Sequence, residues 1–317
     1  MESRNRDQKH RHFLQWLGTI VVFMFLLAGC TVAQADALPY VDLSQRSPLP
    51  SAAASHLIPL RLAVAAIISP QGTAESYGKL ANYLGKKLHR SVQLAQRRTY
   101  AEVNDLVAEE QVDLAFVCTS AYIDGHDSFG MELLAAPEIG GSLVYRSTLI
   151  VAANSPAQTM ADLRGSTFAF TDPMSFTGRV YPTHLVQELG ETPESFFAKT
   201  FFTYSHDRAI EAVAAGVAGA AMIDSLVLDY ALERQPALST KLRVIHRSPP
   251  FGMPPVVTSP TLSVRQKQLL RDALLAMDQD AEGQTILRAL GIDRFLPVKD
   301  ALYADVRRMI EETEARR

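Results

Sequence analysis

The residues that decide the fold begin with the apolar run Leu60-Arg61-Leu62-Ala63-Val64-Ala65, which is typical of a short buried strand. Apolar residues then recur at helical spacing over 75–88 and again over 101–110, so a helix is predicted for each segment. Residues 92–94 and 112–117 have the pattern of strands. This order of strand, helix, strand, helix, strand predicts an α/β fold with a mostly parallel sheet.

A second series of the same kind follows along the chain. Strands are predicted at 147–153, 167–170, 220–223 and 242–246, and helices at 178–189, 207–216, 266–277 and 300–314. Two α/β units joined by extended segments near 145–152 and 245–257 predict two lobes with a hinge and a ligand cleft between them. We predict that residues 59–146 and 254–317 form lobe 1 and that residues 147–253 form lobe 2.

The N-terminus has the features of an export signal: a basic head, an apolar run from Phe13 to Ala28, and a small-residue exit. This largely apolar stretch of 16 residues falls short of the roughly 20 that a membrane-spanning helix requires, which disfavours the alternative of a transmembrane anchor. The exit Leu27-Ala28-Gly29-Cys30 resembles the bacterial lipobox, in which the cysteine is lipidated. The resemblance implies a signal peptide at 1–29 and a protein held by lipid at Cys30 on the periplasmic side of a bacterial membrane. Residues 30–58, rich in Ala, Ser and Pro, predict a flexible tether.

The composition excludes one class of partner and limits the covalent chemistry. The chain has 317 residues, is 47% hydrophobic and 21% charged, and carries a formal net charge of -3, all ordinary for a globular protein. Nucleic acid is not an expected partner, because its binding needs a concentrated basic surface. Cys118 is the only other cysteine, so lipidation of Cys30 would leave no disulfide within the chain. The monomer that we expect must then be stabilised by its core alone.

A hydroxyl-rich segment, Asp172-Pro173-Met174-Ser175-Phe176-Thr177-Gly178, lies between a predicted strand and a predicted helix. The first turn of a helix has unpaired N–H groups and the positive end of the helix dipole. Ser175 and Thr177 can therefore help to form a cradle for an anion. The structural alternative is that Ser175 only caps the helix, a contact that contributes about 1 kcal/mol.

Several segments, in their order and spacing, resemble the phosphonate-binding (PhnD) family of bacterial ABC transporters over about residues 60–297. They are Thr99-Tyr100-Ala101, Val112-Asp113-Leu114-Ala115-Phe116, Tyr145-Arg146-Ser147, Asp162-Leu163-Arg164-Gly165, the hydroxyl-rich segment, and Ser205-His206-Asp207. The resemblance implies a type II periplasmic binding fold. It also implies that the protein captures a small oxyanion such as phosphonate, phosphite or phosphate and presents it to an ABC permease. Phe176 departs from the family pattern, which usually has a hydroxyl residue at this position.

The resemblance adds four further candidate ligand-binding residues. Tyr100 and Tyr145 match pocket positions of the family, and a phenol donates to an oxyanion without adding charge, although both can also be core tyrosines. His206 begins a predicted helix, where it can donate to an anion or cap the helix. Asp224 follows a predicted strand, where the family often has an acidic or polar ligand residue; it can accept hydrogen bonds from a protonated or amino-bearing solute, or cap the next helix.

Cys118 keeps a second function open. Lone buried cysteines usually pack as small hydrophobic residues, but sulfur at a cleft suits a soft, thiophilic centre. The pattern around Cys118 resembles arsenite-sensing binding proteins of the same broad family, which act on a sensor kinase. The segment Pro249-Pro250-Phe251-Gly252-Met253-Pro254-Pro255 resembles a subgroup in which the binding protein often serves signalling as well as uptake. The alternative to oxyanion capture is therefore an arsenite-binding protein that uses Cys118 and signals to a two-component histidine kinase.

An enzyme is not expected. Ser175, His206 and Asp224 contain the side chains of a hydrolytic triad, but the G-x-S-x-G turn that exposes such a serine is absent. The folded part also lacks the HExxH and CxxC motifs of metal sites, so neither a metal nor a cofactor is expected.

Overall fold

The computed structural model describes residues 58–67 and 70–316, with the backbone alone for residues 70–76. The predicted signal peptide, Cys30 and nearly all of the predicted tether lie outside the described residues. The described residues belong to the compact unit Pro50–Arg317. No helix among them combines the length and the apolar character that a membrane crossing requires.

The first of two large sheets has six strands. Their order is β13 (Arg294–Leu296), β4 (Glu132–Glu138), β12 (Val256–Thr258), β3 (Leu114–Phe116), β1 (Leu60–Val64) and β2 (Val92–Gln96). Strand β1 pairs in parallel with β2 and β3, whereas β12 runs antiparallel to both β3 and β4, and β13 runs antiparallel to β4. The three strands that had been predicted for this sheet run in parallel, as expected, but the complete sheet is mixed. Apolar runs indicate burial but not direction, and no strand had been assigned to β4, β12 or β13.

The second sheet has five strands. Their order is β10 (Leu242–Arg247), β6 (Ser147–Ala152), β9 (Ala220–Asp224), β7 (Thr167–Phe170) and β8 (Lys199–Phe202). Strands β9, β7 and β8 run in parallel, and β6 and β10 add antiparallel pairs. A separate pair, β5 (Val144–Tyr145) and β11 (Phe251–Gly252), lies in the two segments predicted as the hinge.

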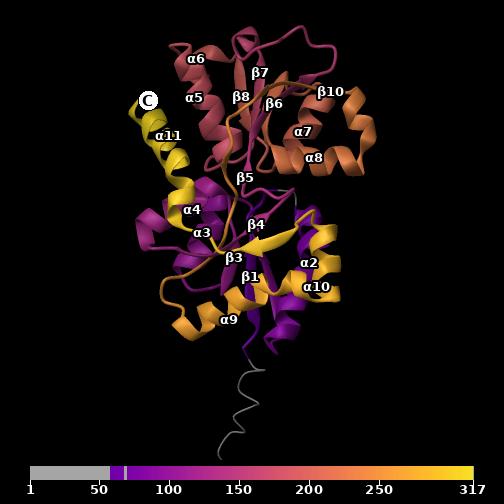
Figure 1. The fold of residues 1–317 in the computed structure, drawn as a ribbon. Coiled ribbons are helices and arrows are strands. Elements are labelled where there is room, and N and C mark those ends of the chain that lie inside the picture. Colours follow the sequence, from indigo (N-terminus) through magenta and orange to yellow (C-terminus); the bar gives the residue numbers. More distant parts are fainter. Residues whose placement is uncertain (1–57, 68–69, 317) are drawn as a thin grey trace, which may run out of the picture. The chain divides into compact units, whose positions relative to one another are not determined.

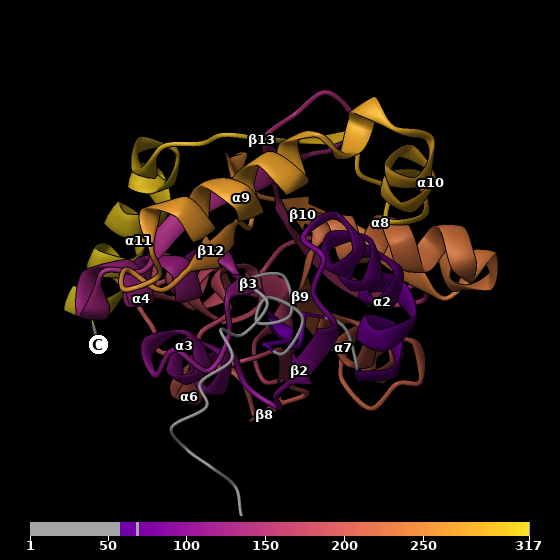
Figure 2. The ribbon, with the colours of Figure 1, turned by 90° about the horizontal axis from the view of Figure 1, so that it is seen from below.

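Helices cover both faces of each sheet (Figure 1). Around the first sheet lie α2 (Pro70–Lys87), α3 (Tyr100–Ala108), α4 (Thr119–Phe129), α9 (Val264–Leu275) and α10 (Ala281–Ala289). Figure 2 shows α3 and α4 on one side and α2 and α10 on the other. Around the second sheet lie α5 (Tyr181–Glu188), α6 (Pro193–Phe196), α7 (His206–Ala214) and α8 (Ser225–Arg234). Helix α11 (Ala304–Ala315) closes the chain and contacts both α4 and α5.

Short turns complete the fold. A π-helical turn, η3 (Phe176–Val180), leads directly into α5. Single 3₁₀ turns are η2 (Ala161–Leu163), η4 (Pro236–Thr240), η5 (Met277–Gln279) and η6 (Asp300–Tyr303).

Local capping sets the position of the first candidate residue. Thr99 caps α3: its side chain accepts from the backbone N–H of Glu102, and the Glu102 carboxylate accepts from the N–H of Thr99 at 3.0 Å. This reciprocal capping box satisfies two backbone donors at once. It places Tyr100 in the first turn of α3, at 0% exposure.

The two sheets share a continuous apolar core. One cluster of buried side chains includes Ala63 and Val117 at the first sheet and Phe168 and Met222 in the second, while each sheet also has a cluster of its own. The predicted lobe boundaries and the movement of the hinge segments stay predictions.

Candidate ligand-binding site

Three of the predicted residues bring buried hydroxyls without a partner. Tyr100, Tyr145 and Thr177 are at most 2% exposed, and their hydroxyl oxygens have no hydrogen-bond partner within the described residues. Buried polar groups are almost always hydrogen-bonded, because an unpaired one costs about 1–3 kcal/mol. Three such hydroxyls at predicted ligand positions therefore need an explanation.

The two tyrosines lie close to Cys118 and Asp224. Burial first, and then the neighbouring Cys118, Asp172, Asp224 and Tyr145, raise the pKa of Tyr100 well above its ordinary value. Burial, Cys118 and Asp224 do the same to the pKa of Tyr145, although the neighbouring Thr119 hydroxyl acts on this pKa in the opposite direction. Both phenols are therefore protonated donors at neutral pH.

Thr177 lies in the turn after β7 and is connected to Asp224 through Ser147. The Ser147 hydroxyl donates to the backbone carbonyl of Thr177 at 2.8 Å, and Ser147 pairs with Asp224 across β6 and β9. We call Tyr100, Cys118, Tyr145, Thr177 and Asp224 the hydroxyl cluster. None of the five is cationic.

Ser175 caps the helix that follows it. Its side-chain oxygen accepts from the backbone N–H of Gly178 at 3.0 Å, which is the structural alternative predicted for this residue. Only glycine fits at position 178, because a Cβ there would lie 1.9 Å from the Thr171 hydroxyl oxygen. The turn thus packs tightly against the carboxyl end of β7, which sets the position of Thr177.

The ring of Phe176 belongs to the core. Its centroid lies 4.6 Å from that of Phe251 in an edge-to-face contact, and it is fully buried. The backbone N–H of Phe176 interacts with the sulfur of Cys118. Phe176 therefore contributes to the site through its backbone.

Cys118 is a free, buried cysteine at the start of α4, with its sulfur 3.8 Å from the hydroxyl oxygen of Ser120. Burial raises the pKa of the thiol, although hydrogen bonds from the backbone of Phe176 and from Ser120 act in the opposite direction. The group at this position is accordingly a neutral thiol at pH 7.

Asp224 of the cluster forms a buried pair with His206. The Asp224 carboxylate accepts from the N–H of Leu226 at 2.8 Å, and the backbone N–H of Asp224 donates to Nδ1 of His206 at 3.1 Å. Burial raises the pKa of Asp224 to about 7 and lowers the pKa of His206 to about 3. A neutral His206 that accepts at Nδ1 carries its proton on Nε2. At neutral pH Asp224 is near its titration midpoint, so it can either accept or donate a hydrogen bond.

Sequence reasoning missed two further buried hydroxyls. Thr171 and Ser205 also lack a hydrogen-bond partner among the residues that the structure describes. Thr171 directly follows β7, and its place at the carboxyl end of a parallel strand is a signal that could have selected it. Ser205 precedes α7 without capping it, which only the structure reveals.

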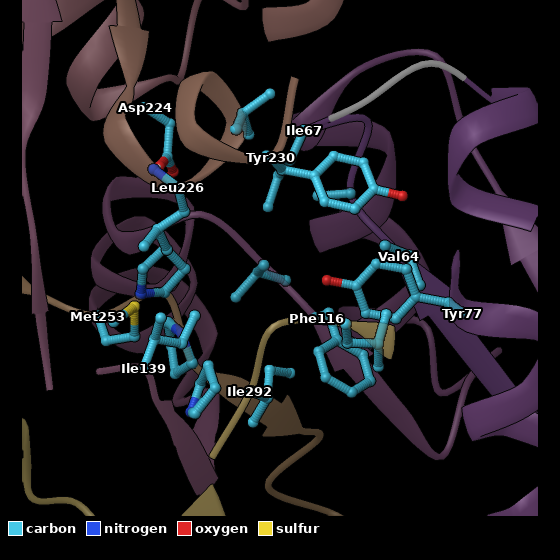
Figure 3. A pocket seen from close by; sticks show the side chains of 17 residues that line it. Val64, Ile67, Tyr77, Phe116, Ile139, Asp224, Leu226, Tyr230, Met253 and Ile292 are labelled. Carbon is cyan, nitrogen blue, oxygen red and sulfur yellow. The ribbon is translucent and has the colours of Figure 1, made fainter. Parts of the chain in front are cut away.

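A cavity of about 130 Å³ adjoins Asp224 (Figure 3). Residues from both sheets and from α2 and α8 line it, and most of their side chains are apolar. Figure 3 shows Asp224 and Leu226 on one side and Tyr77 and Tyr230 on the other. Asp224 is the only charged residue among the lining residues within the described part of the chain. The sequence analysis had predicted a ligand cleft between the two α/β units, but among the residues that line this cavity it had selected only Asp224.

The model of a protein family matches residues 62–303, more than half of the chain, and its description is "ABC transporter, phosphonate, periplasmic substrate-binding protein". The chain belongs to this family. The family consists of transporter-binding proteins and not of enzymes, which confirms that expectation, and it implies a location outside the cytoplasm. The resemblance predicted from the sequence is thereby confirmed.

A curated relative and two solved structures agree with the family. The chain is 30% identical over 169 residues to the phosphate-import protein PhnD of Mycolicibacterium smegmatis, a match that covers 49% of this chain and 53% of that protein. The chain thus spans about half the length of this curated relative.

The structural matches are to a binding protein component of an ABC phosphonate transporter from Pseudomonas aeruginosa and to PhnD1 from Prochlorococcus marinus in complex with methylphosphonate. The first has a TM-score of 0.77 at 22% identity and covers 81% of this chain and 87% of that one. The second has a TM-score of 0.73 at 17% identity and covers 80% and 98%. These likenesses confirm the predicted two-lobed periplasmic binding fold.

Proposed function

We propose that this protein is an extracytoplasmic solute-binding lipoprotein that captures a small oxyanion of the phosphonate, phosphite or phosphate class and presents it to an ABC transporter. The observation that carries the proposal is the set of buried hydroxyls of Tyr100, Tyr145 and Thr177, which have no hydrogen-bond partner in the described part of the chain. The family supports the same conclusion.

The cluster suits an oxyanion because its donors are neutral and buried. A hydrogen bond to a charged group contributes about 1.5–3 kcal/mol, and exclusion of water strengthens each one. Phe176 and Thr177 open a helical turn, whose first N–H groups have no carbonyl partner within the turn, and the N–H of Phe176 interacts with the sulfur of Cys118 instead. Oxyanion oxygens would satisfy the hydroxyl donors that have no partner among the described residues.

Asp224 adds discrimination between protonation states. As a carboxylate it accepts from a protonated phosphonate oxygen, and as a neutral acid it donates to an ionised one. Its pKa of about 7 gives both forms near neutral pH. A solute that still carries one acidic proton is therefore the best match to the ionised form.

Lipidation of Cys30 is part of the proposal. Acyl chains contribute about 0.8 kcal/mol for each buried methylene, so two or more chains give a durable membrane anchor. A binding protein held in this way stays close to the permease that it supplies.

Calorimetric titration of the protein with methylphosphonate, phosphite and phosphate tests the function. We expect saturable binding of at least one of them with one site per chain, and no release of phosphate from phosphate esters on prolonged incubation. The absence of binding for all three anions contradicts the proposal.

Arsenite is a second candidate solute, and the position of Cys118 favours it. The thiol is buried within the hydroxyl cluster and is protonated at neutral pH. Arsenous acid can condense with such a thiol: an arsenic–sulfur bond forms, and one arsenic hydroxyl leaves as water with the thiol proton. In this case the partner would be a two-component sensor kinase.

Replacing Cys118 with Ser separates the two candidates. The hard oxygen of serine is a poor ligand for arsenic(III), so Cys118→Ser should abolish arsenite binding while changing phosphite affinity only modestly. Arsenite binding that survives the substitution excludes the thiol mechanism.

A further inference from the structure

We infer that the solute carries a compact apolar substituent, which the cavity beside Asp224 receives while the anionic head occupies the hydroxyl cluster. The ligand class is then that of organophosphonates with a hydrocarbon group about the size of a phenyl ring. This inference rests on the proposed function and specifies its substrate class.

The size and chemistry of the cavity carry the inference. Its volume is about 130 Å³, and its apolar walls include Val64, Phe116, Ile139 and Ile292. An apolar cavity of about 150 Å³ in another protein, lined by Leu, Ile and Phe, binds benzene. A charged substituent would lose its hydration against such walls, whereas a hydrocarbon group would be stabilised.

The cavity and the hydroxyl cluster have Asp224 in common. Asp224 lines the cavity, and it is also close enough to Tyr100 and Tyr145 to raise the pKa of both phenols. Together with burial, it raises the pKa of Tyr77, which lines the cavity, as well. The chain makes a second connection, because Val117 lines the cavity and the next residue is Cys118 of the cluster. A substituent attached to a head group in the cluster would enter the cavity past Asp224, which Figure 3 shows at one side of the cavity.

Inorganic anions leave this space unused. Phosphate and phosphite have no substituent, and the methyl group of methylphosphonate fills only part of the cavity. Methylphosphonate and phenylphosphonate share a head group and differ in the substituent, so their relative affinity isolates the contribution of the cavity.

The test is calorimetric titration of the full protein with these two phosphonates. We expect phenylphosphonate to bind roughly ten- to a hundredfold more tightly, from the additional apolar area that becomes buried. Val227 is 7% exposed and lines the cavity from α8, so Val227→Phe should fill the space and reduce this preference by about tenfold or more. Ile292→Phe repeats the test from the other sheet in case the first variant does not fold.

Val264→Phe is the matched control. Val264 is 83% exposed at the start of α9, so the same substitution there should leave both affinities unchanged. If methylphosphonate binds and phenylphosphonate binds no more tightly, the inference is overturned and the proposed function stands. If phenylphosphonate is preferred equally by the wild type and by a folded cavity-filling variant, the substituent does not occupy this cavity. If no phosphonate and no phosphate binds, the proposed function itself fails.

Discussion

The hydroxyl cluster and the apolar cavity share Asp224, yet they are incomplete in opposite ways. In the cluster, the hydroxyls of Tyr100, Tyr145 and Thr177 are buried without partners, which costs free energy of folding. In the cavity, apolar side chains such as Phe116 and Ile292 face a space that no protein atom fills, which loses dispersion contacts. Natural sequences tend to break packing and pairing rules at functional sites. The two regions together have the complementarity of one amphipathic solute.

The largest expected effect is on the pH dependence of stability, and it arises from the buried pair of Asp224 and His206. His206 has a folded pKa of about 3, below its unfolded value of 6.5. Its contribution to the free energy of unfolding is therefore complete above pH 6.5 and is lost as the pH falls toward 3. Asp224 has a folded pKa of about 7, above its unfolded value of 3.8. Its contribution to the free energy of unfolding is therefore complete below pH 3.8 and is lost as the pH rises through 7. Between about pH 4 and 6.5 the two trends oppose each other.

His206→Asn should remove one of these trends. Asparagine can still accept from the N–H of Asp224 through its side-chain oxygen, but it does not titrate. We expect the free energy of unfolding of the variant to increase on acidification from pH 6.5 to 4, by about 3 kcal/mol relative to the wild type, at about 1.4 kcal/mol for each pKa unit. Urea unfolding at several pH values measures this difference. His89→Asn, at an exposed residue with a φ of 52° that asparagine tolerates, is the control and should follow the wild type. Parallel pH profiles of the wild type and His206→Asn would contradict the burial of a neutral histidine.

Thr177→Val has the next largest effect and acts on the cluster alone. Valine has nearly the shape of threonine, and the lost hydroxyl has no protein partner, so stability should not fall. Loss of one hydrogen bond to a charged solute should weaken methylphosphonate binding about ten- to a hundredfold in calorimetry.

Thr258→Val is the matched control for Thr177. The Thr258 hydroxyl is also buried but donates to the carbonyl of Asp113 at 2.8 Å. This substitution should lower stability by about 1 kcal/mol and leave affinity unchanged. An equal affinity of the wild type and Thr177→Val would remove Thr177 from the site.

Ser175→Ala should have the smallest effect, and it separates capping from binding within one turn. The Ser175 hydroxyl already accepts from Gly178, so its loss should lower the free energy of unfolding by about 1 kcal/mol. The change in methylphosphonate affinity should be smaller than that of Thr177→Val. An affinity loss as large as that of Thr177→Val at unchanged stability would reverse the roles assigned to the two residues.

The sequence predicted the elements whose apolar pattern is local. Strands β1, β6 and β7 and helices α3 and α7 lie within a few residues of their predicted ranges. Strands β4, β12 and β13 were not predicted, because their place in the sheet depends on pairing with strands far away in the chain.

The same contrast separates the two regions of the site. The residues of the cluster could be selected from the sequence because they lie at or beside the ends of strands or in the first turn of a helix, where a resemblance to a family can match short motifs. The cavity could not be predicted, since Val64, Phe116, Asp224, Met253 and Ile292 come from distant segments and each resembles an ordinary core or capping residue. Only the packing of the two sheets brings them around one space.

The central claim is that the unpaired hydroxyls of the cluster form hydrogen bonds with the solute and do not stabilise the fold. Thermal unfolding of Tyr100→Phe and Tyr145→Phe, each with and without saturating methylphosphonate, tests it most directly. A ligand that binds only the folded state stabilises it by an amount that grows with the logarithm of the ratio of ligand concentration to Kd, so at a fixed concentration a weaker ligand raises the unfolding temperature less. The account predicts that each variant without ligand unfolds at the wild-type temperature or above it, because a buried unpaired hydroxyl has been removed, and that the ligand-induced increase becomes clearly smaller. A lower unfolding temperature without ligand, together with an undiminished ligand-induced increase, would contradict it.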